Sequence, residues 1–143
     1  MVNIKDPISR GIKFFRSPGI IVLGAPVGTV TFEKEALEAR ILSVEKILDL
    51  LPNLEDPHGE YCLLRSCFSL PKITFSLRTI DPSNHMDILA RFDYAIGKSI
   101  ETTLGAPLPY PQQIQTSYPV SMGGMGIRKA VEHALFLTTT IKS

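Results

Sequence analysis

Three basic side chains stand within an otherwise apolar stretch, Cys62–Ile80, that contains no acidic residue. They are Arg65, Lys72 and Arg78. A cation set among apolar residues without a carboxylate to pair with needs phosphate, a backbone carbonyl or water at its tip. The three residues are therefore candidates for phosphate contacts that carry no sequence preference. The alternative is that their aliphatic stems lie along the core and their charged ends extend into water.

Pro71 indicates where one helix ends and the next begins in this stretch. Proline fits the first turn of a helix because its missing N–H has no partner there in any case. We therefore predict two short buried helices that meet at Leu70–Pro71. Alternating apolar residues after the proline also fit a strand, whereas the spacing of Ile73, Leu77 and Ile80 fits a helix. Of the two, we expect the helix.

Residue types that support metal or nucleophilic chemistry are sparse. None of His58, His85 and His133 has a second histidine four residues away, the pair that a zinc-binding helix uses. His58 lies near Cys62 and Cys67, but no fourth ligand is evident. Cys62 and Cys67 are five residues apart, which on a helix separates them by about 140° and disfavours a disulfide. We expect free thiols in a reducing compartment, and we predict no catalytic residue, no metal site and no cofactor.

Composition indicates one globular unit. The chain has 143 residues, 44% of them hydrophobic, and a formal net charge of +1. It contains no run of 18 apolar residues, so no membrane-spanning helix and no membrane partner is expected. The N-terminal sequence MVNIKDPISRG lacks the apolar core of a secretory signal. We expect an intracellular protein, either nuclear or cytoplasmic.

The N-terminal part combines a basic segment with a short hairpin. Residues 1–18 contain RGIKFFRSP, in which basic residues alternate with phenylalanines, a composition suited either to single-stranded nucleic acid or to a tail docked on the core. Ile20–Leu23 is typical of a buried strand, and Ala25–Gly28 is predicted to be the turn after it. Val30 and Phe32 would begin the returning strand.

Helices are predicted for most of the remaining chain. The clearest spans Phe32–Leu51, with Thr31 as its N-cap and an apolar stripe at helical spacing. Others are expected from about Pro57 to Ser69, from a cap at Ser83 or Asn84 to Leu104 before Gly105, and from about Arg128 to Thr140. Ala106–Gln113 holds several prolines and is predicted to be an extended, exposed connector. The expected packing set of the last helix is Val131, Ala134, Leu135 and Leu137.

The glycines of GGMGI, residues 123–127, permit two interpretations. Amides at the following helix N-terminus could meet a phosphate, with Arg128 and Lys129 adding charge. Glycines at such a place more often permit a tight turn and close backbone packing, and we expect packing.

Three pieces of the chain together resemble reverse-transcriptase-like proteins of non-LTR retroelements. GIIVLGAPVG (19–28) resembles the hairpin that follows the palm and grips the primer end, with Leu23, Gly24 and Gly28 as the matching positions. LLRSCFSLPKITFSLRT (63–79) resembles a segment downstream of the palm. YPVSMGGMGIR (118–128) resembles the GGLGI-type segment after the thumb. The pieces occur in the order and spacing of that family and cover residues 19 to about 140.

This resemblance implies a mainly α fold, a thumb-like helical bundle with a short N-terminal β-hairpin. It divides one domain or fragment into a basic tail and hairpin (1–31), a helical bundle (32–104), and a connector, Gly-rich turn and last helix (105–143). It also implies a catalytic Asp pair before the hairpin, yet the sequence has no Asp-Asp pair, and Asp6 is the only acid before Glu33.

We therefore predict a catalytically incomplete fragment that is not an enzyme by itself. Its helices would contact an RNA–DNA or DNA duplex through phosphate. Its other expected partners are the missing palm and fingers portion of a polymerase, or a second copy through self-association. The alternative function is a small helical interaction or scaffold domain, or a non-functional retroelement relic.

Overall fold

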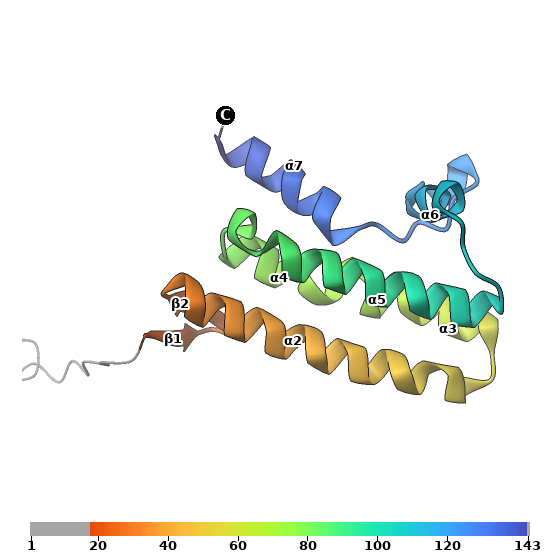
Figure 1. Cartoon of the computed structure of the whole chain (residues 1–143), viewed down its shortest axis with the longest axis horizontal. Coiled ribbons are helices and arrows are strands. Elements are labelled where there is room, and N and C mark those ends of the chain that lie inside the picture. The colour runs from red at the N-terminus through yellow and green to blue at the C-terminus, as the bar shows by residue number, and fades with distance from the viewer. Residues whose placement is uncertain (1–17, 143) are drawn as a thin grey trace, which may run out of the picture.

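The computed structural model describes residues 18–142, which form a mainly helical protein with a two-stranded antiparallel hairpin at its N-terminal end (Figure 1). The predicted fold class is thereby confirmed. The predicted basic tail lies outside the described residues, apart from Pro18. In chain order, the elements are β1 (Gly19–Val22), β2 (Ala25–Gly28), α2 (Val30–Leu50), the 3₁₀ turn η1 (Leu51–Leu54), α3 (Pro57–Leu63), the π-helical turn η2 (Leu64–Phe68), α4 (Leu70–Thr79), the 3₁₀ turn η3 (Pro82–His85), α5 (Met86–Leu104), α6 (Tyr110–Ser117), the 3₁₀ turn η4 (Val120–Met122) and α7 (Ala130–Lys142).

The hairpin turns at Leu23 and Gly24, which have φ angles of 52° and 83°. Positive φ at both central residues is the geometry of the tight turn whose twist matches that of two antiparallel strands. The predicted turn, Ala25–Gly28, is wrong because this segment is strand β2, in which Gly28 pairs with Gly19. The turn residues with positive φ are Leu23 and Gly24, which precede the predicted turn.

Helix α2 begins directly after the hairpin, so Val30 and Phe32 are helical and do not form a returning strand. Its N-cap is Thr29, whose Oγ1 accepts a hydrogen bond from the Phe32 amide at 3.3 Å. The predicted cap Thr31 lies inside the helix, because Thr29 already stands three residues before an amide that needs an acceptor. The apolar stripe is confirmed by the burial of Leu37, Ile41, Val44 and Leu48.

The stretch that carries the predicted cations is helical on both sides of a break at Ser69, whose φ of −82° and ψ of −135° are not helical. Helix α3 passes into η2, where the Ser69 amide donates to the Leu64 carbonyl five residues earlier at 3.0 Å. Helix α4 then begins at Leu70 with a proline in its first turn, which confirms both the helix and the position of the break. Ile73 is buried whereas Phe75 is 46% exposed, so the alternation does not mark a strand.

The 3₁₀ turn η3 precedes helix α5, and the side-chain cap lies before η3 and not at the start of α5. Asp81 Oδ1 accepts from the Ser83 amide at 3.0 Å and from the Ser83 hydroxyl at 2.6 Å. The predicted caps, Ser83 and Asn84, are wrong because both residues lie within η3 after Asp81. The predicted C-terminal end is confirmed, since Gly105 follows Leu104 with a φ of 67°.

The C-terminal part departs most from the prediction. The connector becomes helix α6 at Tyr110, because a proline in the first turn is compatible with helix formation. Helix α7 begins at Ala130, two residues later than predicted. Ala130 and Ala134 are fully buried, whereas Leu135 is 54% exposed and is not part of the packing set.

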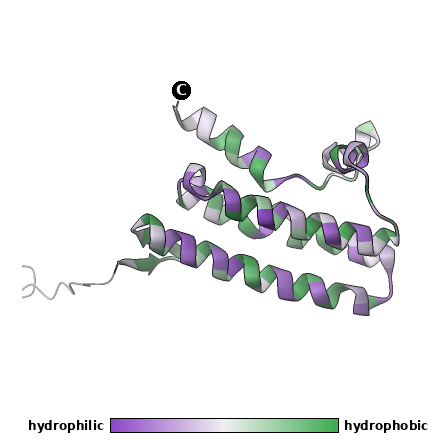
Figure 2. Cartoon of the chain, viewed as in Figure 1, coloured by the Kyte–Doolittle hydropathy of each residue, from purple (hydrophilic) through white to green (hydrophobic). Residues whose placement is uncertain are grey.

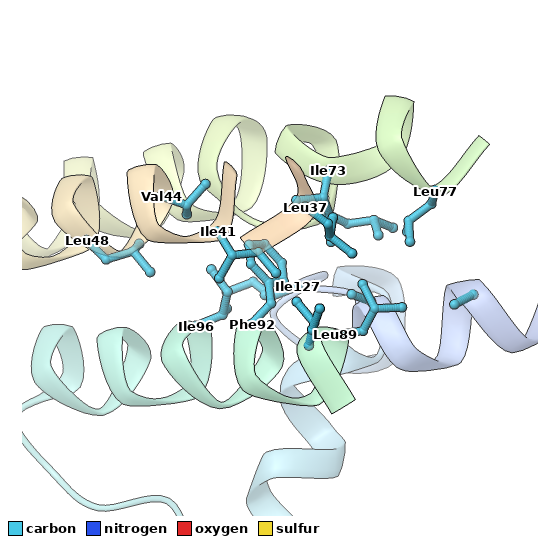
Figure 3. Close-up of a cluster of buried hydrophobic side chains, with 14 of the residues drawn as sticks. Leu37, Ile41, Val44, Leu48, Ile73, Leu77, Leu89, Phe92, Ile96 and Ile127 are labelled. Atoms are coloured by element: carbon cyan, nitrogen blue, oxygen red, sulfur yellow. The ribbon is translucent and has the colours of Figure 1, made fainter. Parts of the chain in front are cut away.

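The core lies where α2, α4 and α5 meet, and Ile127 extends it toward α7 (Figure 3). In Figure 1, α4 and α5 lie between α2 and α7. Arg91 of α5 donates to Glu45 of α2 through Nε at 2.9 Å and Nη2 at 2.7 Å. Thr103 of α5 donates to the buried Glu60 of α3 at 2.8 Å. Helix α5 is thus the element to which the other helices attach.

No helix within residues 18–142 combines the length and the apolar character needed to cross a bilayer.

The hairpin exposes several apolar side chains to water. Its strand beside α2 is coloured green, for hydrophobic residues, in Figure 2. Strand β2 packs on α2 and α4, and Pro26 is buried. A two-stranded sheet is marginal without a covering layer, so this surface is suited to association. The exposed apolar residues of the hairpin and the start of α2 are Ile20, Ile21, Val22, Leu23, Val27 and Val30.

We predict that the protein self-associates through this surface. Ile20 and Val27 are cross-strand partners, so replacing both with threonine keeps strand propensity while removing apolar contact. The double variant should weaken the dimer by about tenfold or more in sedimentation velocity. Leu42→Gln, at a 44% exposed position of α2, is the control that should change nothing. A wild type that stays monomeric at every concentration would contradict the prediction.

Candidate functional site

The three predicted cations are all exposed, but they lie in different surroundings. Arg65 is in the π-helical turn, Lys72 is in the first turn of α4, and Arg78 is in its last turn. Lys72 faces α2, where it lines a hollow of about 640 Å³ that Arg40 also lines. The structure therefore places Lys72 apart from Arg78, which lies near α7.

Arg78 belongs to a group of basic side chains from separate segments. Helix α4 packs against α7, and the guanidinium charges of Arg78 and Arg128 both act on His133 of α7. Burial is the largest influence, and together with these two charges it lowers the pKa of His133 below its ordinary value. His133 Nε2 is buried and has no hydrogen-bond partner within residues 18–142. We call Arg78, Arg128 and His133 the basic cluster.

Arg65 lies against the backbone of the Gly-rich turn at Gly126, two residues before Arg128 in the sequence. Its Nε is 3.1 Å from the position that a Cβ atom would occupy at Gly126, which has a φ of 69°. Among the residues that the structure describes, Arg65, Arg78 and Arg128 form no ion pair with a carboxylate. Arginine without an internal partner can present its planar fork of donors to a phosphate oxygen pair.

The Gly-rich turn is a packed structural element. The Gly126 amide donates to the Tyr118 carbonyl at 2.8 Å, and a Cβ at Gly124 would overlap that same carbonyl. The Tyr61 hydroxyl donates to the Met125 carbonyl at 2.7 Å, which ties α3 to the turn. The interpretation of these glycines as packing residues is therefore confirmed.

The N-terminus of α7 already has an anionic partner within the protein. The Ala130 and Val131 amides donate to the two carboxylate oxygens of Asp93 in α5, at 2.7 and 3.0 Å. A carboxylate at this end of a helix satisfies free amides and complements the helix dipole. These amides are occupied, so the phosphate-binding interpretation of the Gly-rich turn is wrong for them.

The environment of Asp93 is mixed. Burial raises the pKa of its carboxyl, and this effect outweighs the Val131 and Ala130 amides and the nearby Lys129, which act in the opposite direction. The hydrogen bonds nevertheless identify a structural role for Asp93, because each of its carboxylate oxygens accepts a bond from one backbone amide. No signal in the sequence links Asp93 to residues 130 and 131, which lie nearly forty positions further along the chain.

The hairpin residues that match the primer-gripping positions lie at its two ends. Leu23 is 95% exposed at the tip, and Gly24 approaches Phe75 of α4. Gly28 lies opposite Gly19, where a Cβ would overlap the Pro18 carbonyl and the Gly19 backbone. These contacts explain the glycines structurally, and a primer contact at Leu23 stays a prediction.

Cys62 and Cys67 are free, exposed thiols, and Cys62 Sγ lies 3.8 Å from His58 Nε2 on the exposed face of α3. Within residues 18–142, no three histidine, cysteine or acidic side chains are grouped as metal ligands.

Removing the carboxylate of Asp93 should destabilise the fold. Asp93→Ala leaves two partly buried amides without acceptors, and we expect a loss of about 1–3 kcal/mol in the free energy of unfolding, measured with urea. Asp87→Ala on the same helix is the control: its side chain is exposed with a 3.6 Å ion pair to Lys34, so the loss should be clearly smaller than that of Asp93→Ala. Equal losses in the two variants would refute the capping role.

His133 should titrate below about 6.5 in NMR spectra of its ring, and Arg78→Gln should raise its pKa. Because the folded-state pKa is lowered, the contribution of His133 to stability is present above the unfolded-state pKa and is lost as pH falls through the folded-state value. Inorganic phosphate bound at the cluster would raise the pKa by offsetting the two guanidinium charges. A value unaffected by Arg78→Gln would show that the two groups do not interact.

Comparison with known proteins gives a retroelement relative. The Retrotransposable element SLACS 132 kDa protein of Trypanosoma brucei gambiense is 26% identical to this chain over 101 residues. The match covers 71% of this chain, and the chain spans only 8% of that protein. No family model matches the chain, and no solved structure matches it. The likeness supports a retroelement origin for the chain.

Proposed function

We propose that the chain derives from a retroelement reverse transcriptase and that its thumb-like helices contact a primer–template duplex through phosphate. The observation that carries the proposal is the basic cluster. Arg78 and Arg128 approach His133 from segments fifty residues apart in the sequence, and no carboxylate pairs with either arginine within the described residues. The retroelement relative supports the choice of nucleic acid as the anion.

Two properties of the cluster suit a duplex backbone. Guanidinium groups bind phosphate in a bidentate manner and remain charged at any physiological pH. His133 is neutral when its neighbours repel a proton and gains charge when a phosphate offsets them. Contacts of this kind position a duplex without reading its bases. Arg65, which lies against the Gly-rich turn at Gly126, extends the proposed contacts, whereas Lys72 faces α2 and lies apart from them.

The chain would contribute no chemistry to polymerisation. Phosphoryl transfer by polymerases depends on carboxylates that hold two metal ions, and the sequence has no Asp-Asp pair to supply them. We propose that a palm and fingers portion, as another segment or another chain, provides these groups and covers the exposed hairpin. The alternative is that the chain is a helical scaffold domain or a relic. In that case, the charged groups of the basic cluster would contact only water.

Binding to a labelled RNA–DNA duplex, followed by fluorescence anisotropy at several salt concentrations, tests this function. We expect a Kd on the order of 10⁻⁴ to 10⁻⁶ M and, for three contacts, a log–log salt slope of about −2.7. Arg78→Gln and Arg128→Gln should each reduce the magnitude of the slope by about one contact and affect all sequences alike. Lys72→Gln in the same series tests the phosphate contact that the sequence predicts at Lys72.

Lys46→Gln is the matched control, because Lys46 is an exposed cation on α2 and its loss changes the net charge equally. It should leave the slope unchanged. Absence of salt-dependent binding by the folded wild type, or the same slope for Arg78→Gln, Arg128→Gln and Lys46→Gln, would reject the duplex contact and favour the scaffold or relic.

A further inference from the structure

A cavity of about 460 Å³ lies next to the basic cluster, between α5 and the segment that leads into α7. This volume falls in the range of about 300–1,000 Å³ that small-molecule sites occupy. Arg128 lines the cavity and also belongs to the basic cluster, so the two are continuous. The apolar part of the lining is formed by Ile96, Ile100, Leu108, Ile127 and Val131.

Gly97 forms part of the cavity wall from the middle of α5. A glycine inside a helix is destabilising by roughly 0.5–1 kcal/mol relative to alanine, and it is usually explained by a neighbour that leaves no room for a Cβ. At Gly97 no atom lies within 4 Å of that position. Packing therefore does not account for this glycine, and its position opens onto the cavity.

Tyr94 lies one helical turn before Gly97 and presents its ring at the edge of the cavity, where the residue is 67% exposed. Lys98 Nζ lies 5.7 Å from the ring centre. Lys98 also donates to Glu101 at 2.8 Å, which fixes its position. An exposed aromatic ring beside an apolar floor is a surface on which a planar heterocycle stacks.

The charges around the cavity favour an anion at one end. Asp93 is bonded to two backbone amides, and Glu101 accepts from Lys98 and from the Leu108 amide at 3.1 Å, so both carboxylates are internally satisfied. Glu132 is exposed on the α7 side of the cavity. Arg128 and Lys129 are adjacent cations at the same end, where the basic cluster begins.

We propose that this cavity holds one unpaired nucleotide of a strand whose duplex part lies on the basic cluster. The base would stack on Tyr94 above the apolar floor, in the space left by Gly97, and its phosphate would lie at Arg128 and Lys129. The inference rests on the proposed duplex contact. An apolar peptide side chain would fill the floor equally well, but it would leave the adjacent cations without a partner.

The test compares three RNA–DNA duplexes by anisotropy: one with blunt ends, one with a single-stranded overhang, and one with the same overhang lacking its bases. The wild type should bind the overhang duplex about tenfold more tightly than the other two. 2-Aminopurine in the overhang should be quenched on binding. A Cβ at Gly97 would have no atom of another residue within 4 Å apart from the helix's own backbone, so Gly97→Leu can extend into the cavity and also improves helix propensity. Retention of the fold is checked by circular dichroism.

Gly97→Leu and Tyr94→Ala should abolish the overhang preference and leave the blunt-duplex affinity unchanged, whereas Gly97→Ala and Tyr94→Phe should retain most of the preference. If the wild type binds none of the three duplexes, the proposed function itself fails. If it binds all three duplexes equally, or prefers the overhang without bases as strongly, the cavity holds no base while the duplex contact stands. A preference that survives Gly97→Leu places the base elsewhere and overturns the inference.

Discussion

The two hydrogen bonds from the start of α7 to Asp93 fix the C-terminal third of the protein on the central helix. Helix α7 contributes a small apolar face, mainly Ala130 and Ala134, and its larger residues Leu135 and Phe136 are exposed. Apolar burial alone would hold such a helix weakly, since an alanine buries little area. The carboxylate fixes where the helix begins and how it is oriented. The positions of Arg128, Lys129 and His133 relative to α4 and α5 follow from that orientation.

The helices of the middle layer therefore have two distinct sides. On one side, α2 packs on α4 and α5 through the large aliphatic residues of the core and the Glu45–Arg91 pair. On the other side, α7 and the Gly-rich turn pack closely through small residues and backbone hydrogen bonds, and basic side chains remain at the surface. The first side supplies stability, whereas the second brings unlike segments together and leaves room for a cavity. Such a division is typical of proteins in which a rigid frame supports a binding surface.

Local patterns predicted the local structure well. The apolar period of α2, the helix after Pro71 and the Gly105 terminus all depend on neighbours within a few residues, and all are confirmed. The errors at Thr31, Ser83 and the Ala25–Gly28 turn are shifts of a few residues, each caused by a nearby residue that satisfied the same requirement. The basic cluster is different, because Arg78 and Arg128 are brought together by a tertiary contact that no periodic spacing in the sequence predicts. The absence of acidic residues grouped Lys72 with Arg78 as phosphate candidates, although they are six positions apart and so project from different sides of one helix.

The π-helical turn at Leu64–Phe68 holds about one residue more than an α-helical turn of similar height, so it takes up that residue without rotating the helices on either side. Beyond it, Ser69 has a φ of −82° and a ψ of −135°, which are not helical, and α4 begins again at Leu70. The burial of Ile73 and Leu77 therefore depends on the packing of α4 itself and not on a continuous helix from α3. Deleting one residue from the π-helical turn should restore α-helical geometry there and leave Ile73 and Leu77 in the core.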